Sequence, residues 1–172
     1  MFAILLVIIG IFSRVIVHTP QFTATLAIAL FAGMYLKGRM AYIVPVGMML
    51  VTDLILGFHD TMVFTYGSMI AISAIGSFLK SRKSWANVLG GSILGAVIFF
   101  IVTNFGAFLT LYPRTWAGLS DCYILAIPFF RSTLLSTVAY SMVLYAGYEA
   151  LLKYQMGKSC ATQEQSRYGK SL

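Results

Sequence analysis

The sequence predicts an all-α membrane protein in which six transmembrane helices form one bundle. Of its 172 residues, 59% are hydrophobic and only 10% are charged, and the mean hydropathy of +0.87 is far above that of a soluble domain. Apolar runs alternate with short polar segments, and Lys and Arg gather in every second segment. We therefore expect a single six-helix domain over residues 1–152 and a polar cytoplasmic tail over residues 153–172.

Each predicted helix is a nearly continuous apolar run. The six runs cover residues 1–17, 22–36, 41–57, 61–79, 87–111 and 128–152. The first lacks the basic start and the small-residue cleavage pattern of a signal peptide, so we expect it to be retained. The second is rich in alanine and short for a full crossing. In the third, Pro45 stands near the start, where the missing backbone donor costs least.

The basic residues predict the orientation of the helices. The segments after the second, fourth and sixth predicted helices contain Lys37, Arg39, Lys80, Arg82, Lys83, Lys153, Lys158, Arg167 and Lys170. The other side contains Arg14, Arg114 and Arg131. Because short cytoplasmic loops are enriched in Lys and Arg, this asymmetry places both termini in the cytoplasm. Topology thus explains the formal charge of +7, and we do not expect nucleic acid as a partner.

Motifs for catalysis, metals and cofactors are missing from the sequence. The Gly-Lys-Ser run at 157–159 follows Leu152 where a phosphate-binding loop has its first glycine. Ser68 lacks the second glycine of a nucleophile elbow. The two histidines form no HExxH motif, and Cys122 and Cys160 have no metal-ligand spacing. We expect no enzymatic activity, no metal and no cofactor.

Polar and aromatic side chains gather at or near the predicted outer face. They come from five parts of the chain: Arg14, His18, Gln21, Asp53, His59, Asp60, Asn104, Tyr112, Arg114, Trp116, Asp121 and Arg131. Residues 104–131 supply half of them. This convergence predicts a binding site for a small planar or anionic ligand. The alternative is an interfacial belt, because Trp, Tyr and Arg also collect at headgroup depth in membrane proteins.

Asp53 lies about one helical turn inside the third predicted helix. A carboxylate in hydrocarbon costs about 2.5 to 3.5 kcal/mol unless it is paired or hydrated, so we expect Arg14, Arg131 or a ligand as its partner. A structural ion pair between two helices is the alternative. His59 and Asp60 either contact the ligand or end the loop, with Asp60 as the N-cap of the next helix.

The remaining candidate ligand contacts follow in chain order. Asn104 can form hydrogen bonds with a ligand or across helices. Arg114 offers a guanidinium fork and Trp116 a stacking face, although either residue suits an interfacial anchor. Tyr112 adds a second stacking face, and Arg131 a second positive charge for an anionic group.

Thr25, Ala29 and Gly33 recur every four residues along the second predicted helix and form one ridge of small side chains. Such a ridge allows another helix to approach closely. The sequence leaves two interpretations open: contact with an external partner helix, or packing inside the protein's own bundle.

Four stretches carry a family resemblance: residues 112–118 (YPRTWAG), residues 127–131 (IPFFR), residues 27–33 (AIALFAG), and Asp53 with the His-Asp pair at 59–60. Together they resemble an uncharacterised bacterial membrane family related to the S components, the substrate-binding subunits, of energy-coupling factor (ECF) transporters. The resemblance covers roughly residues 10–150.

The resemblance implies an S-component-like fold in the bacterial inner (cytoplasmic) membrane and capture of a vitamin-like, water-soluble micronutrient from the outer side. In that superfamily, transport follows toppling of the subunit when a membrane scaffold and two ATPase subunits engage it. On this analogy, Thr25, Ala29 and Gly33 face the scaffold. The main alternative is a self-sufficient small solute transporter or channel, and a second is a membrane enzyme or chaperone-like structural protein.

Overall fold

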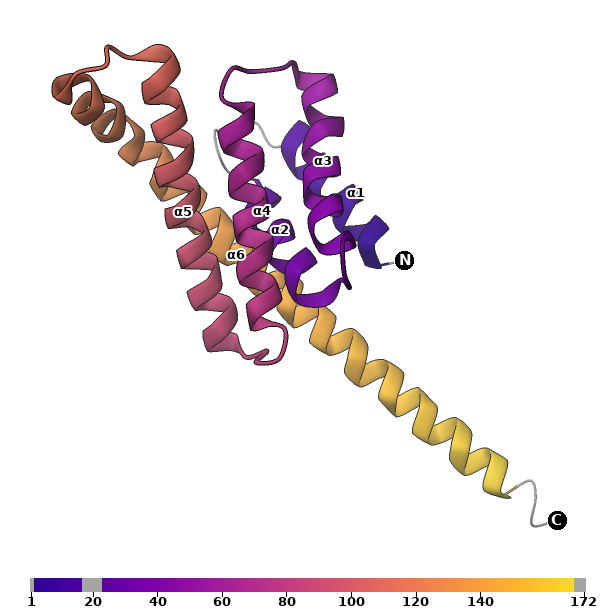
Figure 1. Cartoon of the computed structure of the whole chain (residues 1–172). Coiled ribbons are helices and arrows are strands. Elements are labelled where there is room, and N and C mark those ends of the chain that lie inside the picture. The colour runs from indigo at the N-terminus through magenta and orange to yellow at the C-terminus, as the bar shows by residue number, and fades with distance from the viewer. Residues whose placement is uncertain (1, 17–22, 169–172) are drawn as a thin grey trace.

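The computed structural model describes residues 2–16 and 23–168, and these residues form six α-helices (Figure 1). Side chains are described for residues 4–14 and 23–154. The helices are α1 (Phe2–Ile16), α2 (Thr25–Tyr35), α3 (Met40–Leu56), α4 (Met62–Leu79), α5 (Trp85–Leu111) and α6 (Trp116–Tyr168). The all-α prediction is confirmed. His18 and Gln21 lie outside the described residues.

In the described part of the chain, three helices are long and apolar enough to cross a membrane: α4, α5 and the Trp116–Tyr154 part of α6. Their surfaces expose large apolar side chains, such as Phe78, Ile101 and Val143, which lipid tails would cover. The three remaining helices are apolar but shorter. Length and composition therefore support membrane insertion through three helices, whereas the sequence predicts six crossings.

Helix α2 occupies the centre of the bundle. Every residue from Thr25 to Met34 is buried, and α2 packs against each of the other five helices. A helix with apolar or small side chains on all sides and no charge is stable when other helices enclose it. At 1.5 Å per residue its 11 residues span roughly 16 Å, about half the thickness of the hydrocarbon core. α2 is therefore a buried half-length helix.

Glycines set the distance between α2 and α4. A Cβ atom on Gly33 would lie 2.1 Å from the carbonyl oxygen of Ser73, and one on Gly76 would lie 2.1 Å from that of Leu30. Because these neighbours are backbone atoms, only glycine permits this approach. The Ser73 hydroxyl also donates a hydrogen bond of 3.1 Å to the carbonyl oxygen of Ala29, which ties the two helices together.

Helices α1 to α5 begin and end close to their predicted bounds, but α6 does not. It begins at Trp116, not at residue 128, because the Thr115 hydroxyl accepts a hydrogen bond of 3.1 Å from the Gly118 N–H and starts the helix there. Pro128 lies inside the helix, and because proline has no backbone N–H, the helix lacks one backbone hydrogen bond there. The helix then continues past residue 152 to Tyr168, so no break in secondary structure marks the predicted boundary of the tail.

Helices α1, α3 and α4 surround α2, and α5 and α6 form an antiparallel pair beside them (Figure 1). The pair joins the rest through α4 and α2. A Cβ atom on Gly106 of α5 would lie 2.4 Å from the ring of Phe64 on α4, so this glycine accommodates the ring. Within the described residues, α3 contacts neither α5 nor α6. The end of α3 and the α5–α6 pair are therefore separate regions.

Candidate functional site

Helices α5 and α6 carry the same short motif, two phenylalanines followed by a threonine three residues after the second. It reads FFIVT at residues 99–103 and FFRST at residues 129–133. The Thr103 hydroxyl donates a hydrogen bond of 2.7 Å to the carbonyl oxygen of Phe99, and the Thr133 hydroxyl donates one of 3.0 Å to that of Phe129. Residues four apart share one helical face, so each motif places aromatic and hydroxyl groups together.

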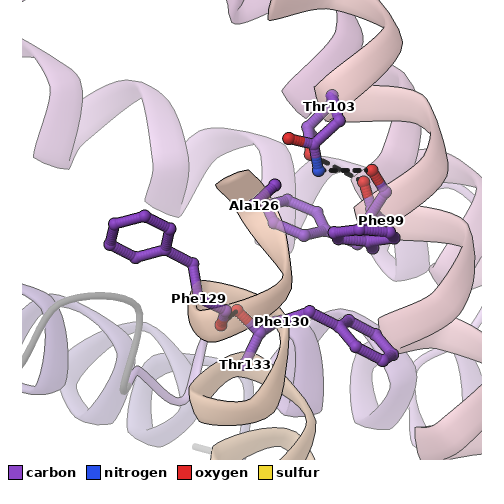
Figure 2. A pocket seen from close by; sticks show the side chains of 8 residues that line it. Phe99, Thr103, Ala126, Phe129, Phe130 and Thr133 are labelled. Atoms are coloured by element: carbon purple, nitrogen blue, oxygen red, sulfur yellow. Dashed lines mark hydrogen bonds between the residues drawn. The ribbon is translucent and has the colours of Figure 1, made fainter. Parts of the chain in front are cut away.

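A cavity of about 140 Å³ lies between α5 and α6 where the two motifs meet (Figure 2). Its walls come from one face of each helix, and its lining residues are Phe99, Phe100, Thr103, Asn104, Ala126, Phe129, Phe130 and Thr133. Figure 2 shows the Phe130 ring extending from α6 toward α5, while the Phe129 ring extends from the opposite side of α6.

The aromatic walls of the cavity are packed against one another. The rings of Phe100 and Phe130 have their centroids 4.7 Å apart at an interplanar angle of 45°. The Tyr123 ring meets Phe100 edge-on, with the centroids 5.6 Å apart and an angle of 81°. Aromatic pairs in this range attract each other beyond the burial of their surface, so the rings hold each other in place.

Asn104 supplies the amide group of the cavity. Its Nδ2 donates a hydrogen bond of 2.7 Å to the carbonyl oxygen of Phe100. Its Oδ1 accepts no hydrogen bond from a described residue and is therefore available to a donor in the cavity. The Cys122 thiol contacts the backbone oxygen of Asn104 at 3.4 Å, which links α6 to α5 beside the cavity.

The lining of the cavity carries no charged side chain. A charged ligand would lose its hydration there without gaining a counter-ion, so the site favours a neutral molecule. Across the described residues, no group of three His, Cys, Asp or Glu side chains is placed to hold a metal ion.

Asp53 lies elsewhere, in a buried polar cluster between α1, α3 and α4. Its Oδ1 is 2.6 Å from Arg14 Nη2, and its Oδ2 accepts a hydrogen bond of 2.7 Å from the Tyr66 hydroxyl. The Asp53 side chain is fully buried, and the Arg14 guanidinium also contacts the Met49 sulfur. Of the three predicted partners of Asp53, Arg14 is the one that the structure shows.

His59 and Asp60 lie in the connection between α3 and α4. The His59 Nε2 atom is 3.4 Å from the Thr65 hydroxyl. Asp60 is exposed, and the prediction that it caps the next helix is wrong, because Thr61 occupies the N-cap position without a side-chain hydrogen bond. Neither residue lines the cavity between α5 and α6.

The remaining predicted ligand contacts lie outside the cavity lining: Tyr112, Arg114 and Trp116 around the start of α6, and Arg131 further along that helix, next to Phe130. Tyr112 is half-buried just after α5. Arg114 and Arg131 are exposed, and Trp116 is 85% exposed. The structure therefore does not gather the eight predicted ligand-binding residues around one hollow. Asn104 is the member of that set that lines the cavity.

The ridge formed by Thr25, Ala29 and Gly33 lies inside the protein. Ala29 is fully buried, Thr25 is 6% exposed, and Gly33 packs against the backbone of α4. The expectation that the ridge faces an external scaffold is therefore not met. Of the two interpretations left open by the sequence, packing within the bundle describes this ridge.

Sequence analysis identified Asn104 but missed the four phenylalanines and Thr133. Phenylalanine is common on lipid-facing helices, so single rings carry no signal. The repeated motif at residues 99–103 and 129–133 is the pattern that distinguishes them.

Comparison with known proteins gives a family but no function. No curated protein and no solved structure matches the chain. Residues 1–160 match a family described as a family of unknown function, DUF6580. Since the match covers nearly the whole sequence, the chain belongs to the DUF6580 family.

Proposed function

We propose that this protein is a membrane subunit that captures one small, neutral, ring-containing molecule in the cavity between α5 and α6 and supplies it for uptake. The observation that carries the proposal is the lining of that cavity, in which the amide of Asn104 lies among the side chains of Phe99, Phe100 and Phe130. Sites for small molecules are typically concave and mostly apolar, with a few polar groups that fix orientation.

The size of the cavity limits the ligand. An apolar cavity of about 150 Å³ holds a molecule the size of benzene, and this one measures about 140 Å³. A single ring with small substituents therefore fits, and its faces can stack on Phe99, Phe100 or Phe130. An N–H or O–H group on the ring can donate a hydrogen bond to Asn104 Oδ1.

Of the two ligand classes expected from the sequence, planar or anionic, the cavity favours the planar one. Arg114 and Arg131 suggested an anionic ligand, but both side chains lie outside the lining. The neutral cavity instead favours a small aromatic or heterocyclic micronutrient. Such a compound is both water-soluble and able to stack, as the vitamin-like ligands implied by the resemblance are.

Coupling to an ECF-type scaffold with two ATPase subunits is the mode of transport that the resemblance suggests. The chain itself has no phosphate-binding loop, which supports an external source of energy. Such a scaffold would contact the apolar outer surfaces of the helices, because the Thr25–Ala29–Gly33 ridge is buried. The resemblance implies a bacterial inner membrane location, and the distribution of Lys and Arg supports both termini in the cytoplasm. That orientation requires an even number of crossings, and therefore a crossing besides those of α4, α5 and α6.

Mass spectrometry of small molecules released from the purified protein tests the proposal. We expect the wild type to release a neutral ring compound, and Asn104→Leu to retain about a tenth as much, because it loses one hydrogen bond and crowds the cavity. Arg114→Ala serves as the matched control and should retain the wild-type amount. Equal retention by wild type and Asn104→Leu would contradict the proposal.

Uptake into proteoliposomes separates the two modes of transport. A capture subunit that depends on a scaffold should bind the released compound without transporting it. Transport by the purified protein alone would instead identify a self-sufficient transporter that uses the same cavity.

A further inference from the structure

Five exposed basic side chains gather at the end of the bundle opposite His59 and Tyr112. They belong to the α2–α3 and α4–α5 connections and are Lys37, Arg39, Lys80, Arg82 and Lys83. We call this set the basic end. Lys80 Nζ donates a hydrogen bond of 2.9 Å to the carbonyl oxygen of Leu36, so the two connections are held side by side.

The described acidic residues leave the basic end largely unneutralised. Asp53, Asp60 and Asp121 lie in the last turn of α3, the α3–α4 connection and the start of α6, toward the other end. None of the five basic residues forms an ion pair with a described side chain. The Glu149 carboxylate on α6 lies near Lys83, where its charge only partly offsets the lowering of the pKa of Lys83.

The geometry of the basic end is fixed by contacts with the bundle. Lys83 Nζ lies 3.9 Å from the centroid of the Tyr35 ring and 6.0 Å from that of Tyr148, positions typical of cation–π contacts. Burial and the nearby Lys80 ammonium both lower the pKa of Lys83. The Asn87 side-chain amide donates a hydrogen bond to the carbonyl oxygen of Arg82. The charges are therefore clustered on a preformed backbone, where an anion would relieve their repulsion.

Large apolar side chains flank these charges in the chain. Phe78 in the last turn of α4 is 83% exposed, and Trp85, the first residue of α5, is 52% exposed. On the other connection, Met40 at the start of α3 is 57% exposed. A cationic cluster next to apolar helix faces is complementary to an amphiphile that carries a negative headgroup and hydrocarbon chains.

We propose that the basic end binds the phosphate headgroup of an anionic phospholipid, with the acyl chains lying along the exposed faces of α4 and α5. The guanidinium groups of Arg39 and Arg82 are suited to bind phosphate oxygens in pairs. An acidic segment of a partner protein would match the charges but would not itself use the exposed apolar side chains of Phe78 and Trp85. The exposed apolar flanks therefore favour the lipid.

Tryptophan fluorescence tests this site directly, because the chain has two tryptophans, Trp85 and Trp116. The Trp116→Phe variant leaves Trp85 as the reporter beside the basic end. It is reconstituted into phosphatidylcholine vesicles that contain a fixed minor fraction of brominated phosphatidylglycerol or brominated phosphatidylcholine. We expect brominated phosphatidylglycerol to quench Trp85 with an apparent binding constant on the order of fivefold higher than that of brominated phosphatidylcholine.

Charge variants in the same background sharpen the test. Arg39→Gln combined with Arg82→Gln should reduce the preference for phosphatidylglycerol over phosphatidylcholine to less than about twofold. The double variant removes the two guanidinium groups that pair with phosphate oxygens. Arg114→Gln removes a charge from the other end and should leave the preference unchanged. Equal quenching of Trp85 by the two brominated lipids would overturn the proposal and leave an acidic protein segment as the partner. That comparison needs no charge variant, so the proposal is testable even if the double variant does not fold.

Discussion

The two regions of the bundle use their polar side chains differently. Between α1, α3 and α4, the Asp53 carboxylate has a charged partner in Arg14 and a hydroxyl partner in Tyr66, and it is closed off from the surroundings. Between α5 and α6, Asn104 lines a cavity and donates to its own helix, and its Oδ1 has no hydrogen-bond partner among the described residues.

This difference separates a structural role from a binding role. A polar group in an apolar region is stable when its hydrogen bonds are made within the protein, and then it fixes the helices that supply them. A group that keeps an open acceptor at a cavity gains a partner when a ligand enters. By this criterion Asp53 stabilises the fold, and Asn104 is the better candidate for ligand contact.

The largest expected effect is on the ion pair. We expect Arg14→Met to lower the free energy of unfolding by about 3 kcal/mol or more, because it leaves the buried Asp53 carboxylate without a counter-charge. Unfolding of the purified protein in detergent measures the change. The double variant Arg14→Met with Asp53→Leu should recover most of the loss, since no buried charge is left unpaired. A double variant no more stable than Arg14→Met would show that the pair is not what connects these helices.

The contact between α2 and α4 should give the next largest effect. We expect Gly33→Ala to cost about 1 to 3 kcal/mol, because its Cβ would lie 2.1 Å from a backbone oxygen of α4 and the helices would have to separate. Gly67→Ala on α4 is the matched control: nothing lies within 4 Å of its Cβ, and alanine favours the helix. If both variants unfold alike, the close approach of α2 and α4 does not limit stability.

The sequence predicts the helices better than it predicts their neighbours. Apolar runs place α1 to α5 correctly, and the cost of a charge in hydrocarbon predicts that Asp53 needs a partner such as Arg14. The position of the Thr25–Ala29–Gly33 ridge was not predictable, because lipid and a protein interior are equally apolar and select the same side chains. The start of α6 was missed because residues 116–121 contain polar and small side chains that also suit a loop.

The candidate site shows the same limit. Residues 104–131 contain half of the polar and aromatic side chains predicted at the outer face, and this content suggested a site near Arg114 and Trp116. The cavity instead lies between the two helices, and half of its lining residues are phenylalanines. Composition locates the α5–α6 region, but it does not show which face of each helix meets the other.

Within the α5–α6 pair, Phe130→Ala should weaken ligand binding about tenfold, because it removes a stacking face and a wall of the cavity. The measurement is the affinity for the compound released from the wild type. Phe78→Ala is the matched control, since that ring is 83% exposed and lies on α4, outside the cavity lining. An equal loss in both variants would indicate a general loss of folding and not a loss of the site.

The smallest expected effect is at the start of α6. We expect Arg114→Ala and Trp116→Ala to change the ligand affinity less than about twofold and the stability by less than about 0.5 kcal/mol, as exposed side chains usually do. Trp116 is 85% exposed, and the helix cap depends on the Thr115 hydroxyl, which both variants keep. The hypothesis drawn from the sequence instead predicts that Arg114→Ala weakens ligand binding in the same affinity measurement. If Arg114→Ala abolishes binding while Asn104→Leu does not, the ligand is held at the tip of the α5–α6 pair, and the cavity between the helices is a packing defect.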